Sequence, residues 1–256
     1  MNFLLIGDVV GRPGRQAIHH FLPGLRRDYD LNLVIANGEN AAGGFGLTLS
    51  TAMELFNAGV DVVTSGNHIW AQSEILPYLQ AGELPILRPL NYPPGVPGRG
   101  YLITGETMII NLIGRTFIGE FDCPFRTMDK LLSELDPKPK NIILDFHAEA
   151  TSEKGALGYY LDGRVSAVLG THTHVGTIDS RILPKGTAFV TDVGMTGPSE
   201  SVIGDDVESV LRRFLTKMPH RLSVGRGKPV LNAVLVRLSD ENGAATGIER
   251  ICLKVE

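Results

Sequence analysis

The sequence has little cysteine. Among its 256 residues, Cys123 and Cys252 are the two thiols, and they stand far apart in no metal-ligand spacing. This usage excludes a disulfide-rich scaffold, and we expect both thiols to be reduced, which indicates a reducing compartment. Any metal site in this chain therefore has to use nitrogen and oxygen ligands.

Positive charge and long apolar runs are also scarce. The formal net charge is −4, which argues against a protein devoted to long DNA or RNA, because such proteins need a basic face to displace counterions. The apolar runs fall short of the roughly 20 residues of a membrane span, and the first one, Phe3 to Ile6, lacks the basic leader of a secretory signal. The sequence therefore predicts a cytoplasmic protein that does not enter a membrane.

What the sequence does contain is short apolar runs, within a composition that is 43% hydrophobic. Its length suits a single large domain over residues 1–256 with a substantial core. Runs rich in Val, Ile and Leu, bounded by glycine and polar residues, are typical of strands buried on both faces. They cover residues 2–6, 31–36, 60–64, 108–112, 141–146 and 165–169.

Helical patterns lie between the first few of these apolar runs. One spans residues 17–25 with an expected break at Pro23-Gly24, and Thr51 with Glu54 predicts a capping box for another. Such alternation indicates an α/β fold with parallel crossovers. In the last third, strands are predicted at 186–193, 230–238 and 245–255, beside a helix capped by Asp205. These strands favour a second, partly antiparallel sheet packed on the first.

Polar residues follow five of the predicted strands. The carboxyl ends of strands in a mainly parallel sheet share one edge, where ligands bind, so we expect these residues to meet. The segments are Gly7-Asp8, Asn37-Gly38-Glu39-Asn40, Ser65-Gly66-Asn67-His68, Asp145-Phe146-His147-Ala148-Glu149 and Gly170-Thr171-His172-Thr173-His174.

Carboxylates, carboxamides and imidazoles are ligands of borderline divalent metals such as Mn, Fe and Zn. The donors are too numerous for one tetrahedral ion and suit two ions that share a bridge. Two such ions clamp the attacking and leaving oxygens of a phosphoryl displacement, with a bridging hydroxide as nucleophile. Each motif alone has an ordinary structural explanation, such as a cap, a turn or a core histidine. Five of them at successive strand ends favour the metal site.

Glycine-rich loops offer a competing interpretation of the N-terminal region. Gly11, Gly14 and Arg15 resemble a phosphate-binding turn before a helix, although the spacing matches neither dinucleotide nor P-loop motifs. A second loop, residues 42–46, carries Phe45, which could stack on a base or simply be buried.

In their order, GD (7–8), GEN (38–40), GNH (66–68), His147 and GTHTH (170–174) resemble the calcineurin-like metallophosphoesterase superfamily. Three positions depart from its usual pattern. Val10 replaces a metal-binding histidine, NGEN replaces GDxxD, and Ile69 replaces the acid that follows GNH. Together with TDVGMTGP (191–198), these departures resemble a bacterial subfamily associated with 2′,3′-cyclic-nucleotide 2′-phosphodiesterase activity.

The resemblance implies a four-layer α/β/β/α sandwich, with two mixed sheets packed face to face and flanked by helices. It also implies two divalent ions, with Fe or Mn as first candidates and Zn as another. Glu39 would bridge the ions, and His68 would protonate the leaving oxygen or stabilise the transition state. The remaining implied ligands are Asp8, Asn40 and His174 for one ion, and Asn67, His147 and His172 for the other.

The predicted activity is hydrolysis of small phosphodiesters, with cyclic nucleotides as the best candidates. Two alternatives stay open: a nucleotide-sensing regulatory protein with little turnover, and a phosphomonoesterase or protein phosphatase on the same fold. Neither a substrate-binding residue nor the role of Arg12 and Arg15 follows from the sequence, and a homo-oligomer is compatible with it.

Overall fold

The computed structural model describes residues 1–255, whose strands form two six-stranded sheets. The first sheet has the order β10-β11-β1-β2-β3, with β12 also paired to β11. Strands β1, β2 and β3 are parallel, and β11 runs antiparallel to β1. The strands of this sheet are β1 (Asn2–Ile6), β2 (Leu33–Asn37), β3 (Val62–Thr64), β10 (Gly197–Asp205), β11 (Val224–Leu238) and β12 (Ala245–Lys254).

The second sheet comes from the middle of the chain and has the order β4-β5-β6-β7-β9-β8. Its four central strands are parallel, and the edge strands β4 and β8 are antiparallel to their neighbours. Its strands are β4 (Tyr101–Thr104), β5 (Thr107–Ile113), β6 (Asn141–His147), β7 (Ala167–Thr171), β8 (Arg181–Ile182) and β9 (Ala188–Val190).

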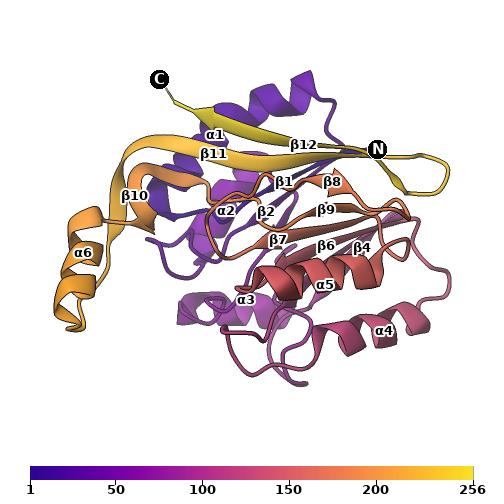
Figure 1. Ribbon diagram of the computed structural model, residues 1–256, viewed down its shortest axis with the longest axis horizontal. Helices are drawn as coiled ribbons and strands as arrows, with labels where there is room; N and C mark the ends of the chain where they lie inside the picture. Colours follow the sequence, from indigo (N-terminus) through magenta and orange to yellow (C-terminus); the bar gives the residue numbers. More distant parts are fainter. Residues whose placement is uncertain (256) are drawn as a thin grey trace.

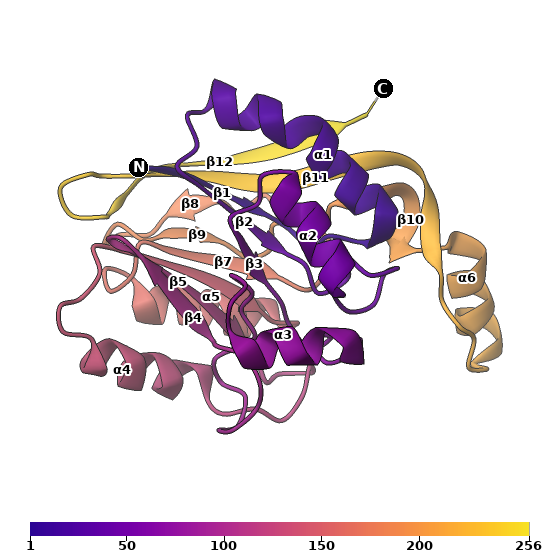
Figure 2. The same ribbon diagram turned by 180° about the vertical axis from the view of Figure 1, so that it is seen from behind.

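Helices cover the outer face of each sheet (Figures 1 and 2). One apolar core lies between the first sheet and the helices α1 and α2, a second lies between the two sheets, and a third lies between the second sheet and α4 and α5. The predicted four-layer sandwich is therefore confirmed. The helices are α1 (Gly11–Asp28), α2 (Leu49–Asn57), α3 (Leu76–Ala81, after the 3₁₀ turn Ser73–Ile75), α4 (Pro124–Glu134), α5 (Thr151–Leu161) and α6 (Val207–Thr216).

Two apolar layers on either side of a strand explain its continuous hydrophobic sequence. On β1, Phe3 and Leu5 face the core between the sheets, whereas Leu4 and Ile6 face the helices. Since successive side chains of a strand alternate in direction, every position from 3 to 6 has to be apolar. The early runs therefore predicted their strands within about two residues.

The prediction for the C-terminal strands is wrong in one respect. The predicted strand at 186–193 contains β9 of the second sheet, but those at 230–238 and 245–255 are β11 and β12, which extend the first sheet, where residues 2–6 of β1 pair with residues 233–237 of β11. β10 was not predicted from the sequence. The second sheet is made by the strands that lie between β3 and β10 in the sequence. Without β11, one edge of the apolar β1 would be unpaired, and β11 supplies its hydrogen bonds.

Three local predictions also need correction. α1 continues through Pro23 to Asp28, since Ile18, Leu22 and Leu25 bury its apolar face on both sides of the proline. The capping box of α2 uses Thr48 and Thr51 in place of Thr51 and Glu54. The cap of α6 is Asp206, which accepts the amide of Ser209, and not Asp205.

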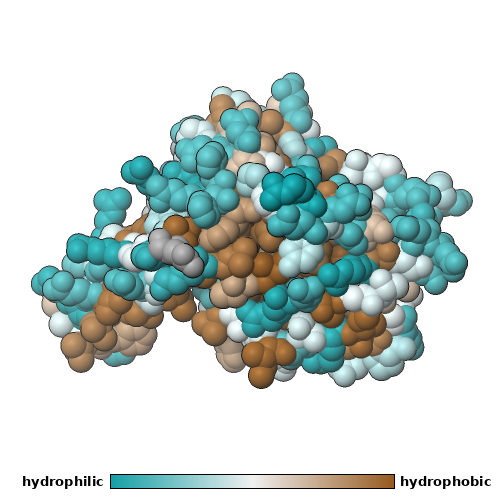
Figure 3. Space-filling view, turned by 90° about the horizontal axis from the view of Figure 1, so that it is seen from above, coloured by the Kyte–Doolittle hydropathy of each residue, from teal (hydrophilic) through white to brown (hydrophobic). Residues whose placement is uncertain are grey.

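α6 projects from the body of the molecule, at the left in Figure 1. In Figure 3 the projection at the lower left carries apolar side chains along its lower edge, and Leu211, Phe214 and Leu215 of this helix are all exposed. Within residues 1–255, none of the helices combines the length and the apolarity needed to cross a membrane.

The core between the sheets provides a stability test. Ile143 on β6 is 1% exposed there, so Ile143→Ala should lower the free energy of unfolding by about 2–5 kcal/mol, because it removes buried methyl groups and leaves a cavity. Ile178 is 95% exposed, and Ile178→Ala should stay within about 0.5 kcal/mol of the parent. Urea denaturation measures both, and equal effects would contradict the assigned layers.

Candidate metal centre

The predicted site residues follow strands of both sheets, so they do not share the edge of one sheet as expected. They meet because the two sheets pack face to face with the carboxyl ends of β1, β2, β3, β6 and β7 at the same end of the sandwich. Asp8 follows β1, Glu39 and Asn40 follow β2, Asn67 and His68 follow β3, His147 ends β6, and His172 and His174 follow β7.

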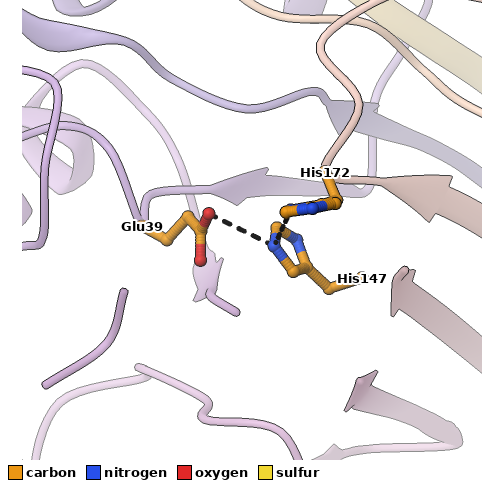
Figure 4. A group of neighbouring side chains, drawn as sticks. All are labelled: Glu39, His147 and His172. Atoms are coloured by element: carbon orange, nitrogen blue, oxygen red, sulfur yellow. Dashed lines mark hydrogen bonds and ion pairs between the residues drawn. The ribbon is translucent and has the colours of Figure 1, made fainter. Parts of the chain in front are cut away.

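One group of donors surrounds His147. Its Nε2 lies 3.2 Å from Oε1 of Glu39, 3.1 Å from Oδ1 of Asn67 and 3.0 Å from Nδ1 of His172. Figure 4 shows Glu39 and His172 both directed at the same ring nitrogen of this imidazole. Donor atoms of Glu39, His147 and His172 all lie within 4.8 Å of one another, a spacing that could hold a metal ion.

A second group lies beside the first. Nε2 of His174 is 3.8 Å from Oδ1 of Asp8 and 3.1 Å from the amide nitrogen of Asn40. Oδ1 of Asp8 is buried and has no hydrogen-bond partner in residues 1–255. Such a buried oxygen is costly unless a cation or proton satisfies it, so this group also has the character of a cation site.

Glu39 connects the two groups. Its Oε1 faces Nε2 of His147 at 3.2 Å and the Asn40 amide nitrogen at 3.3 Å, and its Oε2 accepts the backbone amide of His68 at 3.1 Å. Gly66 leaves room for this arrangement, because a Cβ there would lie 2.2 Å from the ring of His147 and 2.4 Å from Oε2 of Glu39.

Each of the three imidazoles turns one nitrogen away from the centre and toward a fixed partner. Ring nitrogens that bind metals in proteins almost always have this second contact, which fixes the tautomer and leaves the other nitrogen free to ligate. The outward contacts are His147 Nδ1 to Thr171 Oγ1 at 3.0 Å, His172 Nε2 to Glu149 Oε2 at 3.1 Å, and His174 Nδ1 to the carbonyl oxygen of Ile203 at 2.6 Å.

The tautomer of His147 is set by a hydrogen-bonded chain. The hydroxyl of Thr171 donates to Oδ1 of Asp145 at 2.7 Å. Since a hydroxyl has one proton to give, its oxygen accepts from Nδ1–H of His147. Nε2 is then the nitrogen that faces Glu39, Asn67 and His172.

The charges of the centre favour a cation. Burial lowers the pKa of His147, but Glu39, Asp8 and Asp145 outweigh it and raise this pKa to about 9. Burial raises the pKa of Glu39, but His147 and His68 outweigh it and lower this pKa to about 2. Burial also raises the pKa of Asp8. The buried carboxylates thus hold a positive charge on His147, and a divalent ion would satisfy the same charges. The donor set therefore fits the implied metals.

His68 differs from the other imidazoles. Its Nδ1 lies 2.7 Å from Oδ1 of Asn40, and its ring packs on Phe45 with centroids 4.3 Å apart. The residue that follows, Ile69, replaces the usual acid and is buried in the apolar core, so it cannot bond to the ring. The contacts with Asn40 and Phe45 orient the ring instead. Burial lowers the pKa of His68.

The glycine-rich turn at the start of α1 is used for packing. A Cβ on Gly14 would lie 2.3 Å from the carbonyl oxygen of Thr196. Arg15 bonds to Glu54 and to the carbonyl of Ala41, so it fixes α1 to α2 and to the loop after β2. This geometry does not favour the phosphate-binding turn considered above.

A cavity of about 780 Å³ opens over the centre. His68, His172 and His174 line one side, and Arg213 and Arg221, from the α6 projection and the segment after it, line another. Sequence reasoning missed both arginines, because nothing in their local pattern shows that α6 reaches the site. Glu149 and Thr171 lie inside motifs that it did single out.

Comparison with known proteins decides the family. The model of the YmdB-like protein family matches residues 4–251. The chain belongs to this family. A relative from Bacillus subtilis, named 2′,3′-cyclic-nucleotide 2′-phosphodiesterase, is 47% identical over 99% of this chain and 97% of its own.

Two further proteins are similar to this chain over nearly its whole length. A Mycoplasma genitalium protein named putative phosphatase/phosphodiesterase is 39% identical over 98% of this chain and 92% of its own. The crystal structure of a hypothetical protein from Thermus thermophilus has a TM-score of 0.93 and 47% identity, and the match covers 99% of both chains. The family resemblance predicted from the motifs is therefore confirmed.

The metal centre is testable directly. Glu39→Gln removes the charge shared by the two donor groups, so Mn²⁺ affinity should fall by about 100-fold or more, since even outer partners of metal ligands are worth about 10- to 100-fold. Isothermal titration calorimetry on chelator-treated protein measures this. Glu83→Gln, at a position away from the centre on the segment after α3, is the matched control, and unchanged Mn²⁺ binding in Glu39→Gln would contradict the site.

Proposed function

We propose that this YmdB-like chain, as a single domain over residues 1–256, is a two-metal phosphodiesterase that hydrolyses small phosphodiesters. Glu256 lies outside the described residues. The observation that carries the proposal is the meeting of metal-type donors from two sheets, with each ligand imidazole held by an outward contact. The name of the Bacillus subtilis relative supports 2′,3′-cyclic nucleotides as the substrate class for this chain.

The residues that would hold the ions divide into two sets joined by Glu39. Asp8, Asn40 and His174 form one set, and Asn67, His147 and His172 form the other. Asn40 turns its amide nitrogen to Glu39 and His174 and its Oδ1 to His68, so its side-chain amide would have to turn over for the oxygen to ligate. Two divalent ions, with Mn or Fe before Zn for this mixture of oxygen and imidazole ligands, would activate a water as nucleophile and neutralise charge on the phosphoryl oxygens. The negative charge of Asp8 and Glu39 is what would retain them.

His68 is proposed as the proton donor. In its protonated form His68 carries a proton on both ring nitrogens. Nδ1 faces the side chain of Asn40, so Nε2–H is the proton free for the leaving alkoxide. The lowered pKa of His68 makes its protonated form a stronger acid while reducing the fraction that is protonated at neutral pH. Phe45 holds the ring plane, and its exposed face, 54% accessible, offers a surface on which a base could stack.

Hydrolysis of bis-para-nitrophenyl phosphate and 2′,3′-cyclic AMP after addition of Mn²⁺ tests the proposal. His68→Ala should lower kcat by about 10²- to 10⁴-fold while Mn²⁺ affinity stays within about threefold. His19→Ala, an exposed position on α1, should behave as the parent.

The outcomes separate the open alternatives. A protein that binds cyclic nucleotide without turnover, with His68→Ala no different, would be a nucleotide sensor. Faster hydrolysis of para-nitrophenyl phosphate than of the diester would favour a phosphomonoesterase.

Arg213 and Arg221 are proposed to attract the anionic substrate into the cavity. Arg213→Ala and Arg221→Ala should each raise KM for 2′,3′-cyclic AMP by about 2- to 5-fold, the range for exposed charge contacts, and the effect should shrink at high salt. Arg212→Ala is the matched control, since Arg212 is exposed on the same helix and does not line the cavity. Equal KM changes in all three variants would contradict this role.

A further inference from the structure

The segment TDVGMTGP (191–198) runs from β9 toward β10 and passes behind the metal centre. Its backbone contacts both sheets: the amide of Thr196 donates to the carbonyl of Asp8 at 2.8 Å, and the amide of Met195 donates to the carbonyl of His174 at 3.1 Å. One candidate ligand from each sheet, Asp8 and His174, is thus hydrogen-bonded to this segment. None of the roles proposed above accounts for the segment.

The side chain of Asp192 contacts the turn that carries two of the candidate ligands. Its Oδ2 accepts from the hydroxyl of Thr173 at 2.8 Å and from the amide of Thr173 at 3.1 Å. Its Oδ1 accepts the amide of Gly194 at 2.8 Å. Thr173 stands between His172 and His174, so both imidazoles depend on where this residue is held.

The turn around Thr173 has an unfavourable backbone. His172 has a φ of 102° and His174 a φ of 64°, in the left-handed region that residues with a Cβ avoid. Such residues persist only where their surroundings hold them in place, and they concentrate at functional sites. Two hydrogen bonds from Thr173 to one carboxylate supply that constraint at the centre of the turn.

Asp192 is fully buried and has a buried counter-ion. Nζ of Lys154 on α5 lies 2.7 Å from Oδ2, and Lys154 is 1% exposed. A lysine is rarely buried to this degree unless it is paired. Its charge offsets the loss of hydration of the carboxylate, and it contacts the same oxygen, Oδ2, that accepts both hydrogen bonds from Thr173.

We propose that Asp192, with Lys154 as its counter-ion, is a positioning residue that holds His172 and His174 in the conformation that binds metal. The inference rests on the proposed function only for the assignment of these histidines as ligands. Asp192 touches neither the substrate nor the ions. It acts through Thr173, and it prepares the turn before metal arrives.

The sharpest test removes one hydrogen bond and leaves the buried charges in place. Thr173→Val keeps the shape of the side chain but loses the hydroxyl, and Thr173→Ser keeps the hydroxyl. We expect Mn²⁺ affinity, by calorimetry on chelator-treated protein, to fall about 10-fold or more in Thr173→Val, the size seen for outer partners of metal ligands. Thr173→Ser should stay within about threefold of the parent.

A control separates positioning from general stability. Thr187, directly before β9, is also fully buried, and its hydroxyl donates to the carbonyl of Val165 at 2.7 Å. Thr187→Val should cost stability without changing Mn²⁺ affinity. In metal-free protein, amide hydrogen exchange at residues 172–174 should speed up in Thr173→Val and stay unchanged in Thr187→Val.

A second variant tests the ion pair itself. Asp192→Asn alone leaves Lys154 without its counter-ion, and a failure to fold would then hide the effect on metal binding, so the double variant Asp192→Asn with Lys154→Met is used. It should weaken Mn²⁺ binding by at least as much as Thr173→Val. Parent-like Mn²⁺ affinity in both Thr173→Val and the double variant would overturn the inference, whereas a parent chain without Mn²⁺ binding would overturn the proposed function.

Discussion

Asp8 and Glu39 are buried carboxylates at the point where two sheets meet, and their charge has to be compensated inside the protein. Both side chains are fully inaccessible, and one oxygen of Asp8 has no hydrogen-bond partner among residues 1–255. A buried carboxylate without compensation would cost several kcal/mol. The three surrounding imidazoles and the amide oxygen of Asn67 make this location favourable for positive charge, and the amide nitrogen of Asn40 donates to Glu39. The rest of the structure can be understood as the framework that keeps these groups together.

The candidate ligands come from both sheets, so the metal centre forms only where the two sheets pack together. This packing needs strands from both the N-terminal and the C-terminal parts of the chain. Asp8 and Glu39 follow strands of the first sheet, while His147 and His172 come from the second. The first sheet is closed by β11 from the C-terminal third, and residues 191–196 tie Asp8 to His174 across the junction. A loss of packing between the sheets would therefore separate the two halves of the metal centre.

The sequence predicted the four-layer sandwich and the strand ends that lead to the candidate site, but not which sheet each strand joins. Asp8, Glu39 and His147 could be found because each lies at the end of a run whose apolar residues already indicated a buried strand. Sheet membership could not be predicted, since the pairing of β1 with β11 joins residues more than 200 positions apart, and local periodicity contains no information on such a partner. The contact of His174 with the carbonyl of Ile203 was also inaccessible, because any residue supplies a carbonyl and only the fold brings that one close.

The departure at Val10 shows how one substitution can reorganise such a site. Val10 is buried, and a Cβ on Gly204 would approach its Cγ1 to 2.9 Å, so the valine packs directly against the turn at 203–204. Ile203 has a φ of 49° in this turn, and its carbonyl accepts Nδ1–H of His174. A polar imidazole at position 10 would have to share this tightly filled space. The apolar residue at position 10 thus packs against the segment that orients His174, whose other ring nitrogen, Nε2, faces the side-chain amide nitrogen of Asn40 at 3.1 Å.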